Sequence, residues 1–278
     1  MNAVTRPLVR YHGGKWMLAS WIISHFPPHR VYVEPFGGGG SVLLRKPRSY
    51  AEVYNDLDSE IVNLFRVARD QGEELQRRLH LTPFARDELL AAYESSDDPI
   101  ERARHTVVRA FMGFASAAVC GEVTGFRANS NIGGTTPAHD WQNFPEAFAV
   151  IIERLRCIVI ENKYATDIMQ QHDASDTLHY CDPPYVHSTR SDKTHNSNTK
   201  KSYKFELNDN EHRDLAEFLH GLHGMVIISG YPSALYDEIY HDWQRVERPA
   251  LADGARPRTE VLWMNPQCAG LQRNMRLL

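Results

Sequence analysis

The segment with the most distinctive chemistry is a run of four residues: Asp182, Pro183, Pro184 and Tyr185. It follows an apolar stretch of strand character, and its prolines lose backbone donors while their carbonyl oxygens still accept hydrogen bonds. The exocyclic amine of a nucleobase is a poor nucleophile, because its lone pair is delocalised into the ring. Two acceptors on its N–H bonds, the Asp182 carboxylate and the Pro183 carbonyl, would favour a tetrahedral nitrogen. The run is a candidate catalytic segment for group transfer to such an amine, with Tyr185 stacking on a flipped-out base; a plain proline-rich turn is the alternative.

A glycine-rich turn near the N-terminus could hold a ligand for such a reaction. Glu34, Pro35 and Phe36 lead into Gly37 to Gly40 and then Ser41. Ligands of open α/β sheets bind beyond the carboxyl ends of the strands, where glycine allows close backbone approach. Asp56 ends the next predicted strand, where a carboxylate accepts hydrogen bonds from ribose hydroxyls. The order of acid, glycine turn and second acid suits a nucleoside with a cationic amino-acid tail better than a dinucleotide, and a turn without a ligand is the alternative.

Two polar segments have side chains that suit nucleic acid. The segment after the catalytic run is basic, and its Arg190, Lys193, Lys200 and Lys201 are candidate phosphate contacts. Earlier in the chain, Arg127 and Asn129 have the donor and acceptor groups that read base edges in a groove. A solvated loop and a plain polar hairpin are the alternatives.

An α/β scaffold is needed to bring these segments together. Apolar, β-branched runs predict strands at 31–36, 52–54, 157–160, 178–181, 226–229 and 261–264. Helices are expected after Asp58 and over 209–222, where Asn208 and Glu211 form a capping box. This alternation predicts a mostly parallel sheet with helices on both faces. The helix-forming segment 71–148 would interrupt a catalytic domain made of 1–70 and 149–278.

Composition limits the classes of protein that remain. A chain of 278 residues with 42% hydrophobic and 24% charged residues is typical of a globular protein, and its net charge of -4 argues against a generic polyanion binder. Four scattered cysteines and 14 histidines without ligand spacing predict no metal site and a reducing compartment. His212, His220 and His223 are expected on a helix surface. We expect no membrane segment and a cytoplasmic location.

The motifs and their order resemble the Dam-like (D12 class) DNA N6-adenine methyltransferases, and within them the phage-type adenine methylases. Residues 11–15, which read Tyr-His-Gly-Gly-Lys, resemble the family's N-terminal cofactor motif. Residues 34–41 resemble its glycine turn, 55–58 its ribose-binding motif, and 182–185 its catalytic motif. His12 stands where a small residue is expected, and Gly38 and Gly40 make the turn richer in glycine than usual.

The resemblance implies a seven-stranded methyltransferase sheet, S-adenosylmethionine as methyl donor, and flipping of adenine from double-stranded DNA. Segment 71–148 would be a target-recognition, DNA-binding insertion. Asp167 is expected near the donor's adenine. The implied cofactor-binding residues are Tyr11, Gly14, Lys15, Glu34, Pro35, Phe36, Gly37, Gly39, Ser41, Asp56, Leu57, Asp167 and Asp182. A monomer is expected, with a dimer on DNA as the alternative, and phage-protective, restriction-modification and regulatory roles all stay open.

Other activities fit part of the pattern. An N4-cytosine methyltransferase follows the same logic but more often carries serine where this chain has Asp182. An RNA amino-methyltransferase is a second alternative, and a DNA-binding protein with an inactive methyltransferase fold is a third. A nicotinamide-dependent oxidoreductase leaves residues 182–185 unexplained.

Overall fold

The computed structural model describes residues 3–114, 123–129, 135–189, 205–252 and 256–275. The chain divides into two compact units, each made of three separate segments. Unit 1 comprises Met1–Trp16, Gly38–Arg45 and Asp58–Asn162, and unit 2 comprises Met17–Gly37, Lys46–Leu57 and Lys163–Leu278.

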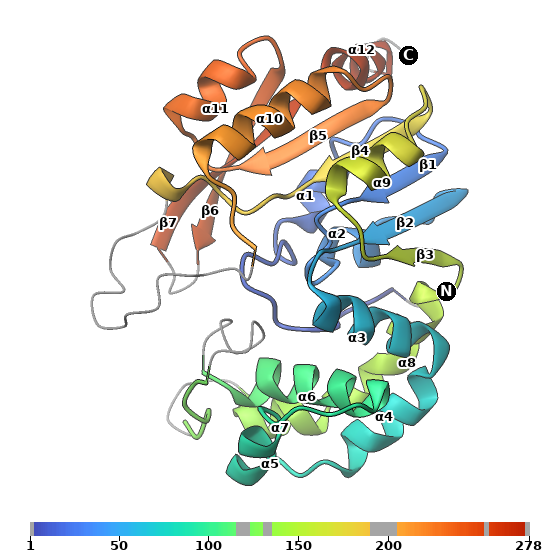
Figure 1. Cartoon of the computed structure of the whole chain (residues 1–278), viewed down its shortest axis with the longest axis vertical. Helices are drawn as coiled ribbons and strands as arrows, with labels where there is room; N and C mark the ends of the chain where they lie inside the picture. Colours follow the sequence, from blue (N-terminus) through green and yellow to red (C-terminus); the bar gives the residue numbers. More distant parts are fainter. Residues whose placement is uncertain (1–2, 115–122, 130–134, 190–204, 253–255, 276–278) are drawn as a thin grey trace. The chain divides into compact units, whose positions relative to one another are not determined.

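Seven strands form one sheet in the order β3-β2-β1-β4-β5-β7-β6 (Figure 1). The pairs β2-β1, β1-β4 and β4-β5 are parallel, whereas β5-β7 and β7-β6 are antiparallel. The predicted α/β class and the seven-stranded sheet are therefore confirmed. The strands are β1 (Val31–Glu34), β2 (Ala51–Asn55), β3 (Ile158–Glu161), β4 (Thr177–Cys181), β5 (Met225–Gly230), β6 (Gln244–Ala252) and β7 (Arg256–Met264).

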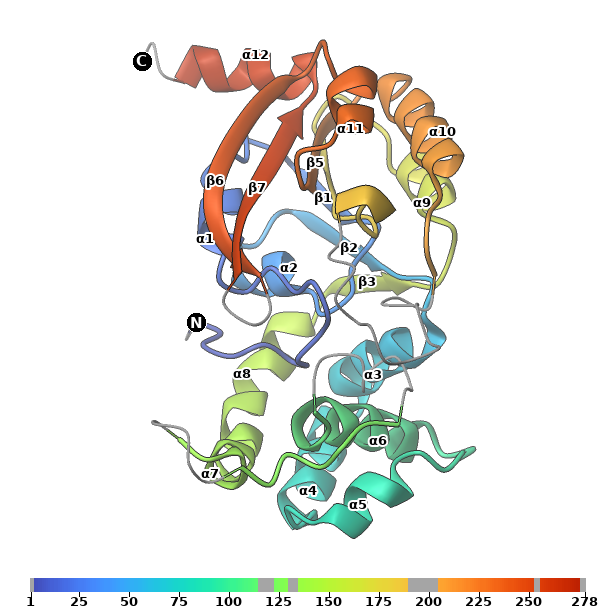
Figure 2. The ribbon, with the colours of Figure 1, turned by 90° about the vertical axis from the view of Figure 1, so that its left-hand side faces the viewer.

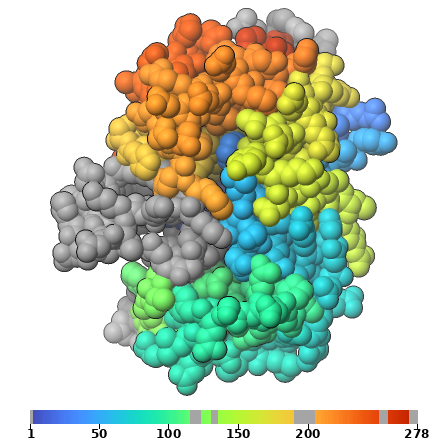
Figure 3. Space-filling view, viewed as in Figure 1, coloured from blue at the N-terminus to red at the C-terminus, as the bar shows by residue number. Residues whose placement is uncertain are grey.

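Helices cover both faces of the sheet in unit 2. Figure 2 shows α9, α10 and α11 on one face and α1 and α12 on the other. In the space-filling view, the atoms of α9 and α10 hide most of the strands behind them (Figure 3). Every residue of β4 and β5 is buried, as expected for central parallel strands packed on both faces. The helices of this unit are α1 (Ala19–Ile23), α9 (Ala165–Gln171), α10 (Asp209–His220), α11 (Ala234–Ile239) and α12 (Pro266–Met275), with the short 3₁₀ helix η2 (His187–Thr189).

Local side-chain chemistry explains where α10 begins. The Asn208 carboxamide oxygen accepts hydrogen bonds from the amides of Asn210 and Glu211 at 2.9 and 3.1 Å. The Glu211 carboxylate in turn accepts the Asn208 amide at 2.7 Å, which confirms the predicted capping box. One expectation for this helix is wrong: His212 is 1% exposed, with its Nδ1 3.2 Å from the Tyr236 hydroxyl. The packing of α10 against α11 covers the His212 ring. Nothing in the sequence indicated this burial, because histidine is a polar residue.

Unit 1 is mainly helical, as the sequence of its central part predicts. Asp58 caps α3 by accepting the Glu60 amide at 3.1 Å, and α3 packs against α4, α6 and α8. The separation of a recognition insertion at 71–148 from the catalytic domain stays a prediction. The helices are α2 (Ser41–Arg45), α3 (Ser59–Asp70), α4 (Gly72–Leu81), α5 (Arg86–Ala91), α6 (Pro99–Met112), α7 (Pro137–Gln142) and α8 (Phe144–Leu155).

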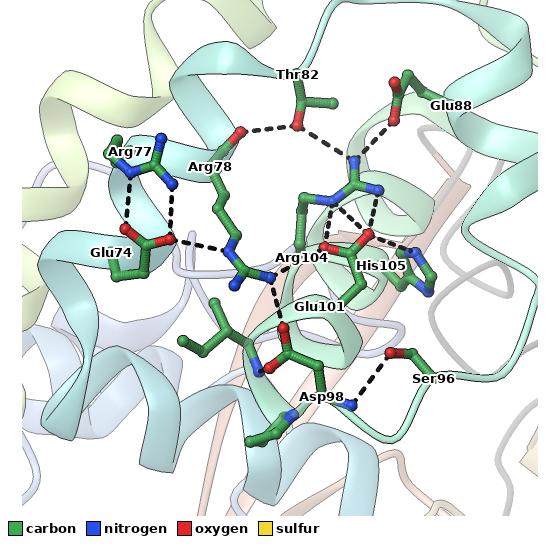
Figure 4. Close-up of polar contacts among 12 residues, drawn as sticks. Glu74, Arg77, Arg78, Thr82, Glu88, Ser96, Asp98, Glu101, Arg104 and His105 are labelled. Carbon is green, nitrogen blue, oxygen red and sulfur yellow. Dashed lines mark hydrogen bonds and ion pairs between the residues drawn. The ribbon is translucent and has the colours of Figure 1, made fainter.

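A network of ion pairs joins α4, α5 and α6 (Figure 4). Arg104 of α6 is only 12% exposed and donates to Glu88 of α5 at 2.7 Å and to Glu101 at 2.5 Å. Arg78 of α4 reaches Asp98, the residue that caps α6, at 2.7 Å. The hydrogen bonds from Arg104 hold the pKa of the Glu101 carboxyl below its usual range. These pairs tie α4 and α5 to α6.

Replacing Arg104 with glutamine is expected to lower the free energy of unfolding by about 1–3 kcal/mol at pH 7, because two carboxylates lose a mostly buried partner. Glu101 has a lowered pKa in the folded state, so its contribution is present above its unfolded pKa and is lost as the pH falls through the folded pKa. The difference between wild type and variant should therefore shrink below about pH 4. Urea unfolding at pH 7, 5 and 3.5 measures it. Arg77→Gln, which breaks an exposed pair with Glu74, is the control and should leave the free energy of unfolding nearly unchanged, because solvent screens exposed ion pairs. Equal losses in the two variants would show that burial of the Arg104 pairs does not matter.

Candidate active site

The order of the strands places a topological switch point between β1 and β4. The chain passes from β1 to β2 on one side and returns to pair β4 with β1 on the other. Ligands of open α/β sheets bind beyond the carboxyl ends of the strands at such a point. Glu34 is the last residue of β1, and Asp182 directly follows β4. Two of the predicted site residues therefore lie at the ends of neighbouring parallel strands in unit 2.

Glu34 is a buried acid at the end of β1. Its side chain is 2% exposed and accepts a hydrogen bond from the Tyr32 hydroxyl at 2.6 Å. Burial, together with the neighbouring Glu34 carboxylate, raises the pKa of Tyr32 well above its usual value, so the phenol stays a donor at neutral pH. Tyr32 thereby orients the Glu34 carboxylate.

Asn55 holds three chain segments together beside Glu34. Its amide nitrogen donates to the carbonyls of Pro35 and Lys163 at 2.9 and 3.0 Å, and its side-chain oxygen accepts the Lys163 amide at 2.9 Å. Its own carbonyl accepts the Gly37 amide at 2.8 Å. These bonds join the segments after β1 and β2 to the segment before α9. Asn55 is the first residue of the segment that resembles the ribose-binding motif, but its part in joining these segments was not predicted, because it depends on contacts with Lys163, 108 residues away.

Close packing explains why glycine stands at position 37. A Cβ atom added there would lie 2.2 Å from the Tyr54 ring, which is fully buried. The backbone after β1 therefore lies directly against the aromatic ring of Tyr54 in β2. Only glycine allows this approach.

The other predicted cofactor residues of unit 2 follow the ends of the strands or begin α9, and they differ in how far they are buried. Asp56 and Leu57 follow β2 and are half-buried, and Phe36 packs against the apolar core that α10 and α11 share with the sheet. Asp167 lies in the first turn of α9 and is exposed. The hydrogen bonds of Asn55 to Lys163 bring the beginning of this helix to the end of β2.

Asp182 is held by a serine from the neighbouring strand. The Ser229 hydroxyl of β5 donates to Asp182 Oδ1 at 2.8 Å, and the Tyr180 hydroxyl lies 3.1 Å from Ser229 Oγ. Ser229 is fully buried. Ser229 was not among the predicted site residues. Its place at the end of a predicted strand is the only signal that the sequence offers.

Tyr185 is anchored at the far side of the same segment. Its hydroxyl donates to the carboxylate of Glu260 on β7, and its ring meets the Tyr231 ring edge-on at 4.6 Å between centroids. Glu260 is 3% exposed, and it too was absent from the predicted set. Burial raises the pKa of Tyr185 well above its usual value, with Asp182 and Glu260 adding to the shift. Pro183 is buried and Pro184 half-buried between these two anchors.

In unit 1, the N-terminal motif and the end of the glycine turn lie against each other. The Gly14 amide donates to the Tyr11 carbonyl at 3.1 Å, and a Cβ at Gly39 would lie 3.0 Å from the Tyr11 Cβ. Lys15 is buried and donates to the Gly13 carbonyl at 2.9 Å. Ser41, the first residue of α2, lies 3.8 Å from where a Gly14 Cβ would be. Residues 11–15 and 38–41, which are distant in sequence, thus form one local structure.

The candidate DNA contacts are described only in part. Arg127 of unit 1 donates to the Phe111 carbonyl at 3.0 Å, and burial and the charge of Arg10 lower its pKa. Asn129 is exposed. Near Arg127, Arg6 and Arg10 both pair with Asp140 at 2.5 Å. Arg190, Lys193, Lys200 and Lys201 lie outside the described residues.

Comparison with known proteins identifies the family. Residues 11–252 match the family described as D12 class N6 adenine-specific DNA methyltransferase. The chain belongs to this family. It is thus a DNA adenine methyltransferase, and the resemblance drawn from the motifs is confirmed.

Curated relatives are similar over most of their length. A DNA adenine methylase of Escherichia coli K12 is 27% identical over 249 residues, which cover 84% of each chain. A DNA adenine methylase of Salmonella typhi is 26% identical over 246 residues, again 84% of each chain. A type II methyltransferase of Lactococcus lactis, M1.LlaDCHI, is 23% identical over 255 residues, 86% of this chain and 85% of its own.

The described residues show neither a metal-binding cluster nor a membrane-spanning helix. They contain no group of three or more histidine, cysteine, aspartate or glutamate residues arranged to hold a metal ion. In the same parts of the chain, no helix has the length and apolar character needed to cross a membrane.

Proposed function

We propose that this methyltransferase takes its methyl group from S-adenosylmethionine and places it on N6 of an adenine flipped out of a specific site in double-stranded DNA. One observation carries the proposal: a buried acid at the end of β1 and an anchored Asp182 after the adjacent β4 flank the switch point of the sheet. The first position suits a donor, and the second suits the amine that receives the methyl group.

The residues after β1 and β2 suit this donor chemically. Glu34 offers a buried carboxylate for a cationic amino group, Gly37 lets backbone approach closely, and Asp56 offers acceptors for ribose hydroxyls. When bound, S-adenosylmethionine supplies a methyl group already activated by its positively charged sulfur. The carboxylates of the site would repel a phosphate-bearing ligand, which favours a nucleoside without phosphates. From the resemblance to the family's motifs, we also propose these residues for the donor site: Tyr11, Gly14, Lys15, Pro35, Phe36, Gly39, Ser41, Leu57 and Asp167.

Asp182 and the Pro183 carbonyl would grip the two N–H bonds of the adenine amine. This grip would direct the nitrogen lone pair toward the methyl group, and the carboxylate would stabilise the positive charge that develops on nitrogen. As the new bond to nitrogen forms, the bond between the methyl group and the donor's sulfur would break to leave a neutral thioether, and the methylated amine would then release one proton to solvent. Pro184 stiffens the segment, and the Tyr185 ring would pack on the extruded base. The protein's contribution is then positioning and charge stabilisation.

We propose two sets of residues for binding DNA. We assign target recognition to segment 71–148, with Arg127 and Asn129 as base-contact candidates and Arg190, Lys193, Lys200 and Lys201 as phosphate contacts. Because its substrate is DNA, we place the enzyme in a bacterial or phage-infected cytoplasm, acting as a monomer.

Base analysis of the product tests the proposal. Purified protein is incubated with unmethylated DNA and S-adenosylmethionine labelled on its methyl group, and the DNA is digested to nucleosides. Label in N6-methyldeoxyadenosine at one sequence context is the expected result. Label in N4-methyldeoxycytidine, label only on RNA, or donor binding without any transfer would each overturn it in favour of a different activity.

Gly37→Ala is expected to weaken both stability and donor binding. The added methyl group cannot fit beside the buried Tyr54 ring, so the backbone after β1 must shift. Overpacking of this kind costs about 1–3 kcal/mol, and we expect affinity for S-adenosylmethionine to fall about tenfold or more as the turn is displaced. Thermal melting and titration calorimetry measure the two effects.

Gly270→Ala is the matched control for Gly37→Ala. Position 270 lies in α12, and a Cβ there meets nothing within 4 Å. Alanine should stabilise this exposed helical position by about 0.5–1 kcal/mol and leave donor affinity unchanged. If Gly37→Ala behaved like Gly270→Ala, close packing at position 37 would not matter to the site.

A further inference from the structure

Ser229 is a buried hydroxyl residue with no role in the mechanism proposed above. Ser229 lies near the end of β5, and its side chain is fully buried. Its hydroxyl donates to Asp182 Oδ1 at 2.8 Å and lies 3.3 Å from the Cys181 carbonyl oxygen. Ser229 is therefore placed to influence the orientation of the Asp182 carboxylate.

The register of the sheet explains the contact. β4 and β5 are parallel, with Tyr180 opposite Ile227 and Cys181 opposite Ile228. One residue beyond the end of this register, Asp182 and Ser229 follow Cys181 and Ile228, and the 2.8 Å hydrogen bond shows that the two side chains meet. The serine is therefore presented to the carboxylate by the rigid centre of the sheet rather than by a loop, which limits how far either side chain can move.

The direction of the hydrogen bonds follows from the protons available. A hydroxyl has one proton, and an ionised carboxylate can only accept. When Ser229 donates to Asp182, the Tyr180 hydroxyl, 3.1 Å from Ser229 Oγ, must donate to the serine. Burial and the negative charge of Asp182 raise the pKa of Tyr180 well above its usual value, so its proton is present throughout the neutral range.

The two hydrogen bonds thus run in one direction, with Tyr180 donating to Ser229 and Ser229 donating to Asp182 Oδ1. Such a chain fixes one oxygen of the carboxylate and, because the group is planar, sets the orientation of the other. Successive hydrogen bonds polarise one another in a buried setting, which strengthens the last bond to the carboxylate. A carboxylate held in this way needs less reorganisation when it grips an amine.

We propose that Ser229, supported by Tyr180, is a positioning residue for Asp182 in methyl transfer, an inference that rests on the function proposed above. Ser229 does not touch the base or the donor. It acts on the rate of transfer by holding the acceptor carboxylate in its productive orientation. Loss of its hydroxyl should therefore slow the chemical step and leave the binding of both substrates unchanged.

The test compares single-turnover rates at saturating DNA and S-adenosylmethionine, because product release can mask chemistry in steady-state kcat. Ser229→Ala is expected to lower the rate about 10- to 100-fold, with the Kd for S-adenosylmethionine and the KM for DNA within about twofold of wild type. Tyr180→Phe, which leaves the Ser229 proton in place, should lower it only several-fold. Adding Tyr180→Phe to Ser229→Ala should have no further effect, since both act on Asp182 through the same hydroxyl.

Two controls separate positioning from packing. Ser229→Cys fills the same space with a weak donor, so it should be nearly as slow as Ser229→Ala. Thr177→Val removes another buried hydroxyl, which donates to the His172 carbonyl at 2.8 Å at the opposite end of β4. It should lower the melting temperature and leave the rate unchanged.

The outcomes distinguish failure of the proposed function from failure of the positioning role of Ser229. If the wild-type protein methylates no DNA, the proposed function itself fails. If the wild type is active and Ser229→Ala stays within twofold of its rate, the positioning role is wrong while the function stands. Should Ser229→Ala fail to fold, a Ser229→Cys enzyme with wild-type rate, or equal losses in Thr177→Val, would overturn the inference in the same way.

Discussion

Replacing Asp182 with asparagine is expected to lower the single-turnover rate of adenine methylation by at least about 100-fold. Asparagine keeps the shape of the side chain and an oxygen that can accept the Ser229 hydroxyl, but it loses the negative charge. Positive charge develops on the amine nitrogen as the methyl group arrives, so the charge itself matters most in the transition state. Binding of S-adenosylmethionine should change much less than the rate. Transfer of labelled methyl groups and titration calorimetry measure the two quantities.

Asp173→Asn is the matched control for this substitution. Asp173 is mostly buried, and its carboxylate accepts the backbone amides of His223 and Gly224 at 2.9 and 2.8 Å. These bonds lie before β4 and β5 begin, away from the catalytic segment. The variant should be less stable than wild type and still transfer methyl groups at the wild-type rate. A wild-type rate in Asp182→Asn would remove Asp182 from the chemical step.

Glu34→Gln is expected to weaken binding of S-adenosylmethionine about 10- to 100-fold, which corresponds to the loss of one charge-assisted hydrogen bond in a buried setting. The Tyr32 hydroxyl can still donate to the glutamine oxygen, so the local fold should persist. A ligand that binds the folded state raises its melting temperature by an amount that depends on its concentration and Kd. The rise produced by a fixed concentration of donor should therefore be much smaller in the variant.

A second buried glutamate on the neighbouring strand provides the comparison. Glu52 of β2 is also 2% exposed, and it pairs with Lys46 at 2.6 Å. Glu52→Gln leaves a buried lysine without its charged partner, so it should destabilise the protein by about 3 kcal/mol or more. Its rise in melting temperature on adding donor should match that of wild type. Equal donor responses in the two variants would mean that Glu34 serves stability and not binding.

Local patterns determined much of what the sequence alone could predict. The capping box at Asn208 and Glu211 is formed by neighbours in the chain, so its prediction needed no knowledge of the fold. The runs that became β1, β2, β4 and β5 were readable for the same reason, since strands buried on both faces are mostly apolar even where they include a buried acid such as Glu34 or Glu52. The chemistry of residues 182–185 was also visible, because a carboxylate, two prolines and an aromatic residue directly after a strand are unusual for purely structural reasons.

Pairing between distant segments decided the rest. Strand β6 was not predicted, because its mostly exposed and charged sequence around Arg245 and Arg248 has no strand pattern of its own and becomes a strand by pairing with β7. Ser229 is 47 residues from Asp182, and Glu260 is 75 residues from Tyr185. Their contacts exist because β5 lies beside β4 and β7 lies beside β5. Sequence therefore identified the groups that do the chemistry, whereas the order and register of the strands, which are set by long-range packing, decided which residues hold those groups in place.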